Sequence, residues 1–263
     1  MNWSKIKTMF IYLFIALNVM LLGFYVYTVY KNKVEIVQEK EVIERAMKND
    51  GIKIEENQPK KENLGYINVT GSNFKDIKKE TSGLKLEVET VDKYSKLKGT
   101  LDTAITNIDK NNYRAELDTF LAEKYKAGNH YMFSNYDVTE KTVTYEQVID
   151  GVRVFDNKNA RLVFKVEANG DIKSFEQTAV TNIRKDKNET LVTQSQAINR
   201  LYHEDLIPKE SRVKATLGYY TYISQTENQV LIPTWCVEII SKNDVVKKYY
   251  VDAIELNILN KGN

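Results

Sequence analysis

The sequence MFIYLFIALNVMLLGFYVYTVY, from Met9 to Tyr30, decides how the rest of the chain is arranged. These 22 residues carry no charge, and as a helix rising about 1.5 Å per residue they would span about 33 Å. The hydrocarbon core of a bilayer is about 30 Å thick, and a chain that crosses it must satisfy its backbone hydrogen bonds internally. A cleavable signal peptide has a shorter apolar region followed by small residues, and this stretch has neither feature. It therefore predicts a permanent transmembrane helix at residues 9–30.

The charges that flank this stretch indicate its orientation. Lys5 and Lys7 precede it with no acidic residue nearby, whereas glutamates soon follow Lys31 and Lys33. Because basic residues are retained on the cytoplasmic side, we expect residues 1–8 in the cytoplasm. The chain is then a single-pass protein of the cell membrane whose C-terminal domain is extracytoplasmic.

The predicted membrane helix offers two faces for contact with other helices. Ala16, Gly23 and Tyr27 share one face at helical spacing, and Asn18 projects from roughly the opposite face. An amide in the middle of a membrane prefers a partner on another helix, although such a contact contributes only about 1 kcal/mol. These four residues are the candidate partner-binding residues. The alternative is a simple anchor that tolerates Asn18 without a partner.

Residues 31–63 have the pattern of a juxtamembrane stalk and linker. Apolar residues recur at three- and four-residue steps from Val34 to Met47, which predicts that the membrane helix continues outward. Gly51 suits the left-handed position that follows a helix end, and the polar segment around Pro59 is typical of a linker. The stalk either packs on its own domain or forms a coiled coil with a partner.

Composition excludes some classes of function. The first 34 residues hold four lysines and no acid, so the remainder has 34 basic residues (38 − 4) against 36 acidic ones. This near neutrality provides no basic surface for a nucleic-acid backbone. The single cysteine, Cys236, excludes an intrachain disulfide. It lies in the alternating run TWCVEII, which predicts a buried and unreactive thiol.

Turn and cap signals divide the later part of the chain into short elements. Asp150-Gly151 and Asn169-Gly170 are hairpin pairs between strand-like runs. Thr193 or Ser195 is the expected cap of a helix that starts near residue 194.

The order of these elements occurs twice. A helix is followed by a long aromatic strand and three further strands, and the second helix starts about 80 residues after the first. Antiparallel strands with a helix on one face predict an α+β fold. We therefore expect an N-terminal transmembrane helix followed by an ectodomain of two similar helix-plus-antiparallel-sheet units, residues 64–185 and 186–263.

The sequence carries no recognisable catalytic pattern. His130 and His203 are the only histidines, and neither has another ligand at metal-binding spacing. No nucleophile elbow and no glycine-rich phosphate loop occurs. We predict that the protein is not an enzyme, with no catalytic residues, no metal ligands and no cofactor.

Three segments carry a resemblance to a known family: NWSKIKTMFIYLFIALNVMLLG from Asn2, TYEQVIDGVRVFDNKNARLVFKVEANGDIKSFEQT from Thr144, and IPTWCVEI from Ile232. They resemble the YycI (WalI) family of membrane-anchored regulators of a cell-wall two-component system in low-GC Gram-positive bacteria. The resemblance implies a non-catalytic role beside a WalK-type sensor histidine kinase, together with the sister protein YycH. It implies action through transmembrane and ectodomain contacts. Arg153 stands in the neighbourhood where the family usually has proline.

A second reading comes from the same central segment, which also looks like the wider PepSY type of propeptide module. That pattern implies an extracytoplasmic module that binds a ligand or inhibits a peptidase. Tyrosine-rich strands such as LGYYTYI would then line a cleft between the two units. This function remains the alternative at this point.

Overall fold

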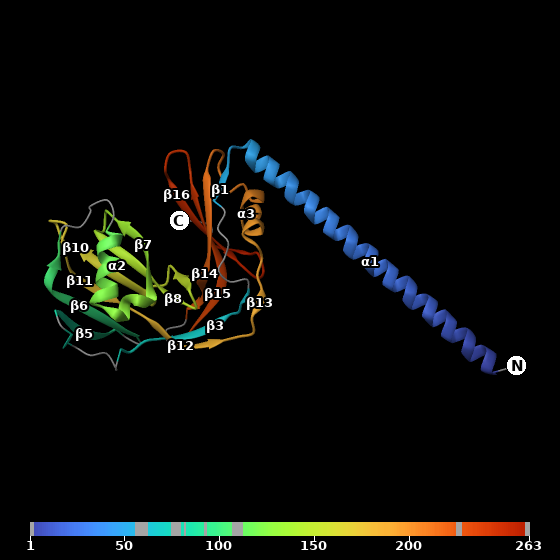
Figure 1. Ribbon diagram of the computed structural model, residues 1–263, viewed down its shortest axis with the longest axis horizontal. Helices are drawn as coiled ribbons and strands as arrows, with labels where there is room; N and C mark the ends of the chain where they lie inside the picture. The colour runs from blue at the N-terminus through green and yellow to red at the C-terminus, as the bar shows by residue number, and fades with distance from the viewer. Residues whose placement is uncertain are drawn as a thin grey trace. The chain divides into compact units, whose positions relative to one another are not determined.

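The computed structural model describes residues 3–55, 63–74, 80–81, 83–91, 94–106, 113–224 and 228–260. The fold is α+β, with one long N-terminal helix and a body dominated by antiparallel strands, which confirms the predicted class (Figure 1). Compactness divides the chain into two units. The first contains the N-terminal helix and residues 208–211, and the second contains residues 54–207 and 212–263.

The first unit is built on α1, Trp3–Asn49, an uninterrupted helix of 47 residues (Figure 1). It ends in a Schellman motif, in which Ile52 donates its backbone N–H to the Met47 carbonyl at 3.0 Å and Gly51 donates to Lys48 at 3.1 Å. Gly51 has a φ of 72°, a left-handed conformation that glycine adopts at no steric cost. The predicted continuation of the helix and the place of Gly51 at its end are confirmed.

Residues 208–211 hold the end of α1. The Lys209 ammonium lies 2.8 Å from the Asp50 carboxylate, and the Glu210 N–H donates to the Asp50 carbonyl at 2.8 Å. The Lys53 N–H donates to the Ser211 carbonyl at 2.9 Å, and the short strand β1, Lys53–Glu55, begins there. The segment predicted as a stalk and linker therefore contains a strand, which pairs with β14.

The remaining elements form the body, and their bounds in chain order follow. The helices are α2 Arg114–Glu123, the 3₁₀ helix η1 Lys126–His130, and α3 Gln194–His203. The strands are β2 Asn63–Leu64, β3 Ile67–Gly71, β4 Glu80–Thr81, β5 Leu84–Val91, β6 Tyr94–Ile105, β7 Tyr131–Asp137, β8 Thr142–Ile149, β9 Val152–Phe155, β10 Arg161–Val166, β11 Ile172–Gln177, β12 Val180–Lys185, β13 Glu189–Thr190, β14 Arg212–Ser224, β15 Asn228–Ile240, β16 Val246–Asp252 and β17 Ile258–Asn260.

One extended path of strands runs through the body in the order β12-β3-β15-β14-β9-β8-β10-β11-β6-β5-β4. Every step of this path is antiparallel except β14–β9, which is parallel. β7 pairs with β8, and β16 pairs with β15. The short strand β9 therefore joins the strands around α2 to the strands around α3.

α2 packs against the strands β5 to β8, β10 and β11 (Figure 1). It buries Leu117, Phe120 and Leu121 in a core shared with apolar residues of β5 to β8, β10 and β11. The Phe120 ring stands edge-on to the Phe164 ring, with 6.0 Å between the ring centres. Aromatic pairs in this geometry contribute beyond their buried area, so this contact fixes the helix on the sheet.

α3 packs against β14 and β15. Thr193 caps it in a capping box with Gln196, which confirms the first of the two predicted cap residues. Just before the helix, the Val192 carbonyl accepts the indole N–H of Trp235 at 2.9 Å. Trp235 is almost completely buried, so this hydrogen bond ties the start of α3 to the core.

The two predicted hairpin pairs are confirmed. Asp150 and Gly151 have φ values of 55° and 83° between β8 and β9, and Gly170 has a φ of 90° between β10 and β11. Positive φ at these positions matches the right-handed twist of the flanking strands.

Strand pairing crosses the predicted boundary between residues 185 and 186. β12 pairs with β3, and β3 pairs with β15, where Val69 is the register partner of Gln229. Long-range pairing of this kind leaves no local pattern. The division into units at 64–185 and 186–263 stays a prediction from the sequence.

Candidate functional site

The four predicted partner-binding residues lie in α1, and all of them are exposed. Asn18 donates its side-chain amide to the Phe14 carbonyl one turn earlier at 2.8 Å. A Cβ atom added at Gly23 would meet no other atom within 4 Å. Ala16, Gly23 and Tyr27 follow one another at seven- and four-residue steps, so they share one helix face.

These residues fall in the one segment of the described chain that is long and apolar enough to cross a membrane. It runs from Ile6 to Tyr27, with a mean hydropathy of 2.2, and none of it is buried against the rest of the chain. The length and composition of this segment indicate a single-pass membrane anchor.

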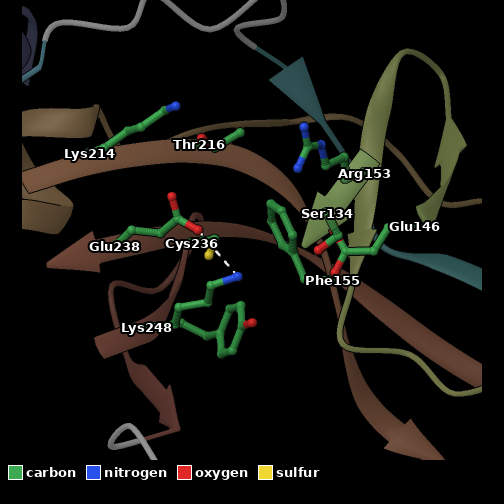
Figure 2. A pocket seen from close by; sticks show the side chains of 10 residues that line it. Ser134, Glu146, Arg153, Phe155, Lys214, Thr216, Cys236, Glu238 and Lys248 are labelled. Carbon is green, nitrogen blue, oxygen red and sulfur yellow. Dashed lines mark ion pairs between the residues drawn. The ribbon is translucent and has the colours of Figure 1, made fainter. Parts of the chain in front are cut away.

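A polar cavity lies elsewhere, on one face of β14, β15 and β16 (Figure 2). The register aligns Lys214, Glu238 and Lys248 in one row across the three strands, and Thr216, Cys236 and Tyr250 in the next row. The residues between them in sequence, such as Ala215 and Val237, are buried on the other face. The cavity is completed by β7, β8 and β9, and its lining residues are Ser134, Glu146, Arg153, Phe155, Lys214, Thr216, Cys236, Glu238, Lys248 and Tyr250.

An ion pair occupies one side of the polar cavity. Lys248 Nζ lies 3.2 Å from Glu238 Oε1, and both side chains are about one-third exposed (Figure 2). Burial lowers the pKa of Lys248, but the adjacent Glu238 carboxylate, together with Cys236 and Glu146, outweighs this effect and raises the pKa above its usual value. These two charges neutralise each other within the cavity.

Glu146 is the most deeply buried acidic residue of the cavity, with 7% of its surface exposed. Its Oε1 accepts the backbone N–H of Asp156 at 3.2 Å, the one hydrogen bond that its carboxylate makes with the described residues. Burial raises the pKa of the Glu146 carboxyl, although this hydrogen bond and the nearby cations Arg153 and Lys248 act in the opposite direction. The hydrogen bond and the nearby cations therefore offset only part of the free-energy cost of burying the Glu146 carboxylate.

The floor of the polar cavity is aromatic and contains the cysteine. Phe155 and Tyr250 lie with their ring centres 5.9 Å apart, and the Tyr250 hydroxyl donates to the Asp156 carboxylate at 2.7 Å. Cys236 is 5% exposed, and burial raises the pKa of its thiol to about 12. The prediction of a buried thiol is confirmed, and a raised pKa disfavours the thiolate, which is the reactive form.

Local sequence features position two further side chains. Ser134 is the extra residue of a bulge in β7, because Phe133 pairs with Tyr145 while Asn135 pairs with Thr144. Bulges redirect side chains and are frequent beside functional sites. On β14, a Cβ atom at Gly218 would clash with the Phe155 ring, so glycine is needed for β9 to lie alongside.

The polar cavity could not be predicted from the sequence. Its one local signal was the alternation of Lys214 and Thr216 with apolar residues, which is equally typical of a solvent-facing strand. The residues that complete it come from β7, β8 and β9, and their proximity depends on the parallel β9–β14 pairing. In the described part of the chain, no group of three or more His, Cys, Asp or Glu residues is arranged to hold a metal ion.

Comparison with known proteins gives likenesses to solved structures and one family. A protein from Eubacterium rectale ATCC 33656, described as uncharacterized, has a TM-score of 0.47 and 11% identity, covering 80% of this chain and 91% of its own. The Bacillus megaterium YpeB C-terminal domain has a TM-score of 0.42 and 14% identity, covering 85% of this chain and 95% of its own. No curated protein sequence matches. The family model described as YycI protein matches residues 31–254.

Proposed function

The chain belongs to the YycI family, and on that basis we propose that it is a membrane-anchored, non-catalytic regulator of a WalK-type sensor histidine kinase. The family assigns it to two-component regulation. The finer proposal is that it acts together with YycH, through contacts of its transmembrane helix and of its ectodomain. The observation that carries the proposal is the match over residues 31–254 directly behind an apolar segment long enough to span a membrane.

The proposed contact residues on the membrane helix are Ala16, Asn18, Gly23 and Tyr27. Small residues let two helices approach closely in a bilayer, where van der Waals packing drives association. Gly23 suits this role because the space beside its Cα is open. Asn18 already satisfies one amide hydrogen within its own helix, and its second amide hydrogen and its carbonyl oxygen remain for a partner.

A regulator of this kind biases the kinase between two states. A partner can shift such an equilibrium only by contacting one state more favourably than the other. Substitutions on the contact face should therefore change kinase output as well as association.

The test is co-purification of the kinase and YycH with variants of the full chain at equal expression. Gly23→Leu together with Ala16→Leu should weaken association, because the added side chains fill the open face without disturbing this chain's own packing. Asn18→Leu tests the opposite face separately. Leu17→Phe is the matched control, because it adds a larger side chain at a position rotated by about 100° around the helix axis from Ala16. This variant should leave association intact. Unchanged association and kinase output in all contact-face variants would exclude the helix-contact mechanism.

The proposed orientation places the N-terminus in the cytoplasm and the body outside. Lys187 is exposed, and a Lys187→Cys variant should react with a membrane-impermeant maleimide in intact cells, whereas Lys5→Cys should react only after lysis. The native Cys236 gives little background, because it is buried and its thiol pKa is about 12. If only the Lys5→Cys variant were labelled in intact cells, the orientation would be the reverse of the proposed one.

A further inference from the structure

We propose that the polar cavity between β7–β9 and β14–β16 is a binding site for a small monocarboxylate anion, held by Arg153 and Lys214 with hydroxyl donors from Ser134 and Thr216. This goes beyond the proposed function, because it gives the body a ligand of its own. It does not depend on the kinase contact.

The first observation is a set of unused donors around one cavity. Among the described residues, the side chains of Ser134, Arg153, Lys214 and Thr216 make no hydrogen bond and no ion pair. Three of them are half-buried and only Lys214 is exposed. Figure 2 shows Lys214 and Thr216, on β14, to one side and Arg153 and Ser134, on β9 and β7, to the other. An arginine fork matches the two oxygens of a carboxylate, and hydroxyl and ammonium groups can donate further hydrogen bonds to them.

The second observation is the charge balance. The Lys248–Glu238 ion pair is internally neutral, which leaves the cations of Arg153 and Lys214 against the single carboxylate of Glu146. The side chains that line the cavity therefore carry one excess positive charge when Glu146 is ionised, and the Asp156 carboxylate, which accepts the Tyr250 hydroxyl at 2.7 Å, lies outside the lining. A singly charged anion neutralises it, whereas a dianion would leave excess negative charge close to Glu146.

The third observation is size. The water-accessible space of the cavity is about 60 Å³. At about 10–15 Å³ for each water by this kind of measure, the space holds about four to six waters. The four non-hydrogen atoms of acetate fit this space, and its methyl group has an apolar surface to meet in Phe155 and Tyr250.

The bulge at Ser134 and the glycine at position 218 support a built site. Without the bulge, the alternation of β7 would place a different side chain at the rim. Without Gly218, the Phe155 ring and the β9 backbone that carries Arg153 could not lie against β14. Two local departures from regular strand structure thus place Ser134 and Arg153 in the lining of the same cavity.

The experiment is thermal unfolding of the purified full chain in detergent micelles, titrated with sodium acetate while sodium chloride keeps the ionic strength constant. Binding to the native state alone raises the unfolding temperature in a saturable way as acetate increases. We expect this rise for the wild type. We expect the acetate concentration for half-maximal effect to increase at least about tenfold for Arg153→Gln, because the paired donors of the guanidinium are lost.

Two further variants and one control variant keep the test decisive. Lys214→Gln alters an exposed side chain that the fold does not need, so weakened acetate binding in this variant cannot result from misfolding. Glu146→Gln removes the one carboxylate of the lining that has no cationic partner, and it should tighten acetate binding several-fold at neutral pH. Arg184→Gln is the matched control, since Arg184 is exposed on β12 and does not line the cavity, and it should bind acetate as the wild type does.

Three results would overturn the proposal. The first is a wild-type unfolding temperature that responds to acetate no more than to chloride. The second is unchanged acetate binding in both Arg153→Gln and Lys214→Gln. The third is tighter binding of sulfate, which is a dianion at neutral pH, than of acetate, which would contradict the single-charge assignment. None of these outcomes bears on kinase association, so the two proposals fail separately.

Discussion

At the scale of single residues, Glu146 is a buried carboxyl whose charge is only partly offset by its neighbours. It is almost fully buried, and burial raises its pKa above the usual value of a glutamate. The charged and titratable groups close to it are Arg153, Asp156, Cys236, Lys248 and Tyr250. A group whose pKa is higher in the folded state favours folding below its unfolded pKa, and this contribution is lost as pH rises through the folded pKa.

Replacing Glu146 by glutamine should therefore stabilise the protein at neutral pH. The glutamine keeps an oxygen to accept the Asp156 N–H but carries no charge, so the variant should unfold at a higher temperature than the wild type at about pH 7.5. The difference should shrink at about pH 5, where the wild-type carboxyl is increasingly protonated. The measurement is the unfolding temperature of both chains across this range, in buffer without carboxylates.

Glu167→Gln is the control for this comparison, because Glu167 is exposed in the turn after β10. It should show no pH-dependent difference from the wild type. An equal difference between wild type and Glu146→Gln at both pH values would contradict the burial argument.

At the scale of elements, local signals decide the helix ends and the turns. The capping box of α3 is one example, since Thr193 Oγ1 accepts the Gln196 N–H at 3.3 Å and Gln196 Oε1 accepts the Thr193 N–H at 2.8 Å. Both bonds satisfy donors that a helix start would leave unpaired.

Thr193→Ala should lower the free energy of unfolding by about 1 kcal/mol, because it removes the side-chain acceptor at the N-cap. Urea unfolding followed by circular dichroism measures this loss. Thr193→Ser retains the hydroxyl and should unfold close to the wild-type midpoint. An alanine variant that matches the wild type would mean that α3 is held by its packing alone.

Close packing at Gly218 gives a second prediction for the elements. An alanine Cβ there would overlap the Phe155 ring and lie 2.6 Å from the Arg153 carbonyl, so Gly218→Ala should reduce stability by about 1–3 kcal/mol. The same urea measurement applies. Combining it with Phe155→Leu should recover part of the loss, because the smaller side chain yields space. Losses that simply add in the double variant would show that the two residues do not interact.

Some of these elements could be predicted from the sequence and others could not. The uninterrupted α1, Gly51 at its end, the Thr193 cap and the two glycine turns all rest on interactions between residues close in the chain, and each was predictable. The insertion of β3 beside β15 and the parallel β9–β14 pairing rest on residues far apart, and no short pattern encodes them. The polar cavity depends on the distant pairing of β9 with β14 and on the bulge at Ser134, and neither feature could be predicted from a short sequence pattern. Its residues were therefore visible in the sequence only as ordinary polar positions.

At the scale of the whole molecule, α1 connects the apolar segment to residue 50 without a break. A continuous helix rotates by about 100° per residue, so its length sets the rotational phase between the membrane face of Ala16 and the Schellman motif at Gly51. The ion pair between Asp50 and Lys209 and the hydrogen bond from Glu210 hold this end in place.

This continuity predicts a phase dependence of kinase control. Two alanines inserted after Tyr30 change the phase by about 200°, whereas seven alanines restore it to within about 20°. The seven-residue insertion should therefore preserve more control of kinase output than the two-residue insertion. Reporter expression from a kinase-dependent promoter, at equal membrane levels of both variants, measures the difference. Full control in the two-residue variant would mean that the anchor and the body act independently.

The place of β3 between β12 and β15 has a consequence for how the polypeptide is made. A ribosome releases β3 and β12 long before β15, so a growing chain carries unpaired strand edges until synthesis is almost finished. Pairing across such a distance is slow, which lengthens the period in which these edges attract other chains. A chain truncated before Asn228 lacks β15, so β3 has no partner on that side. We expect such a truncated chain to be degraded by quality-control proteases.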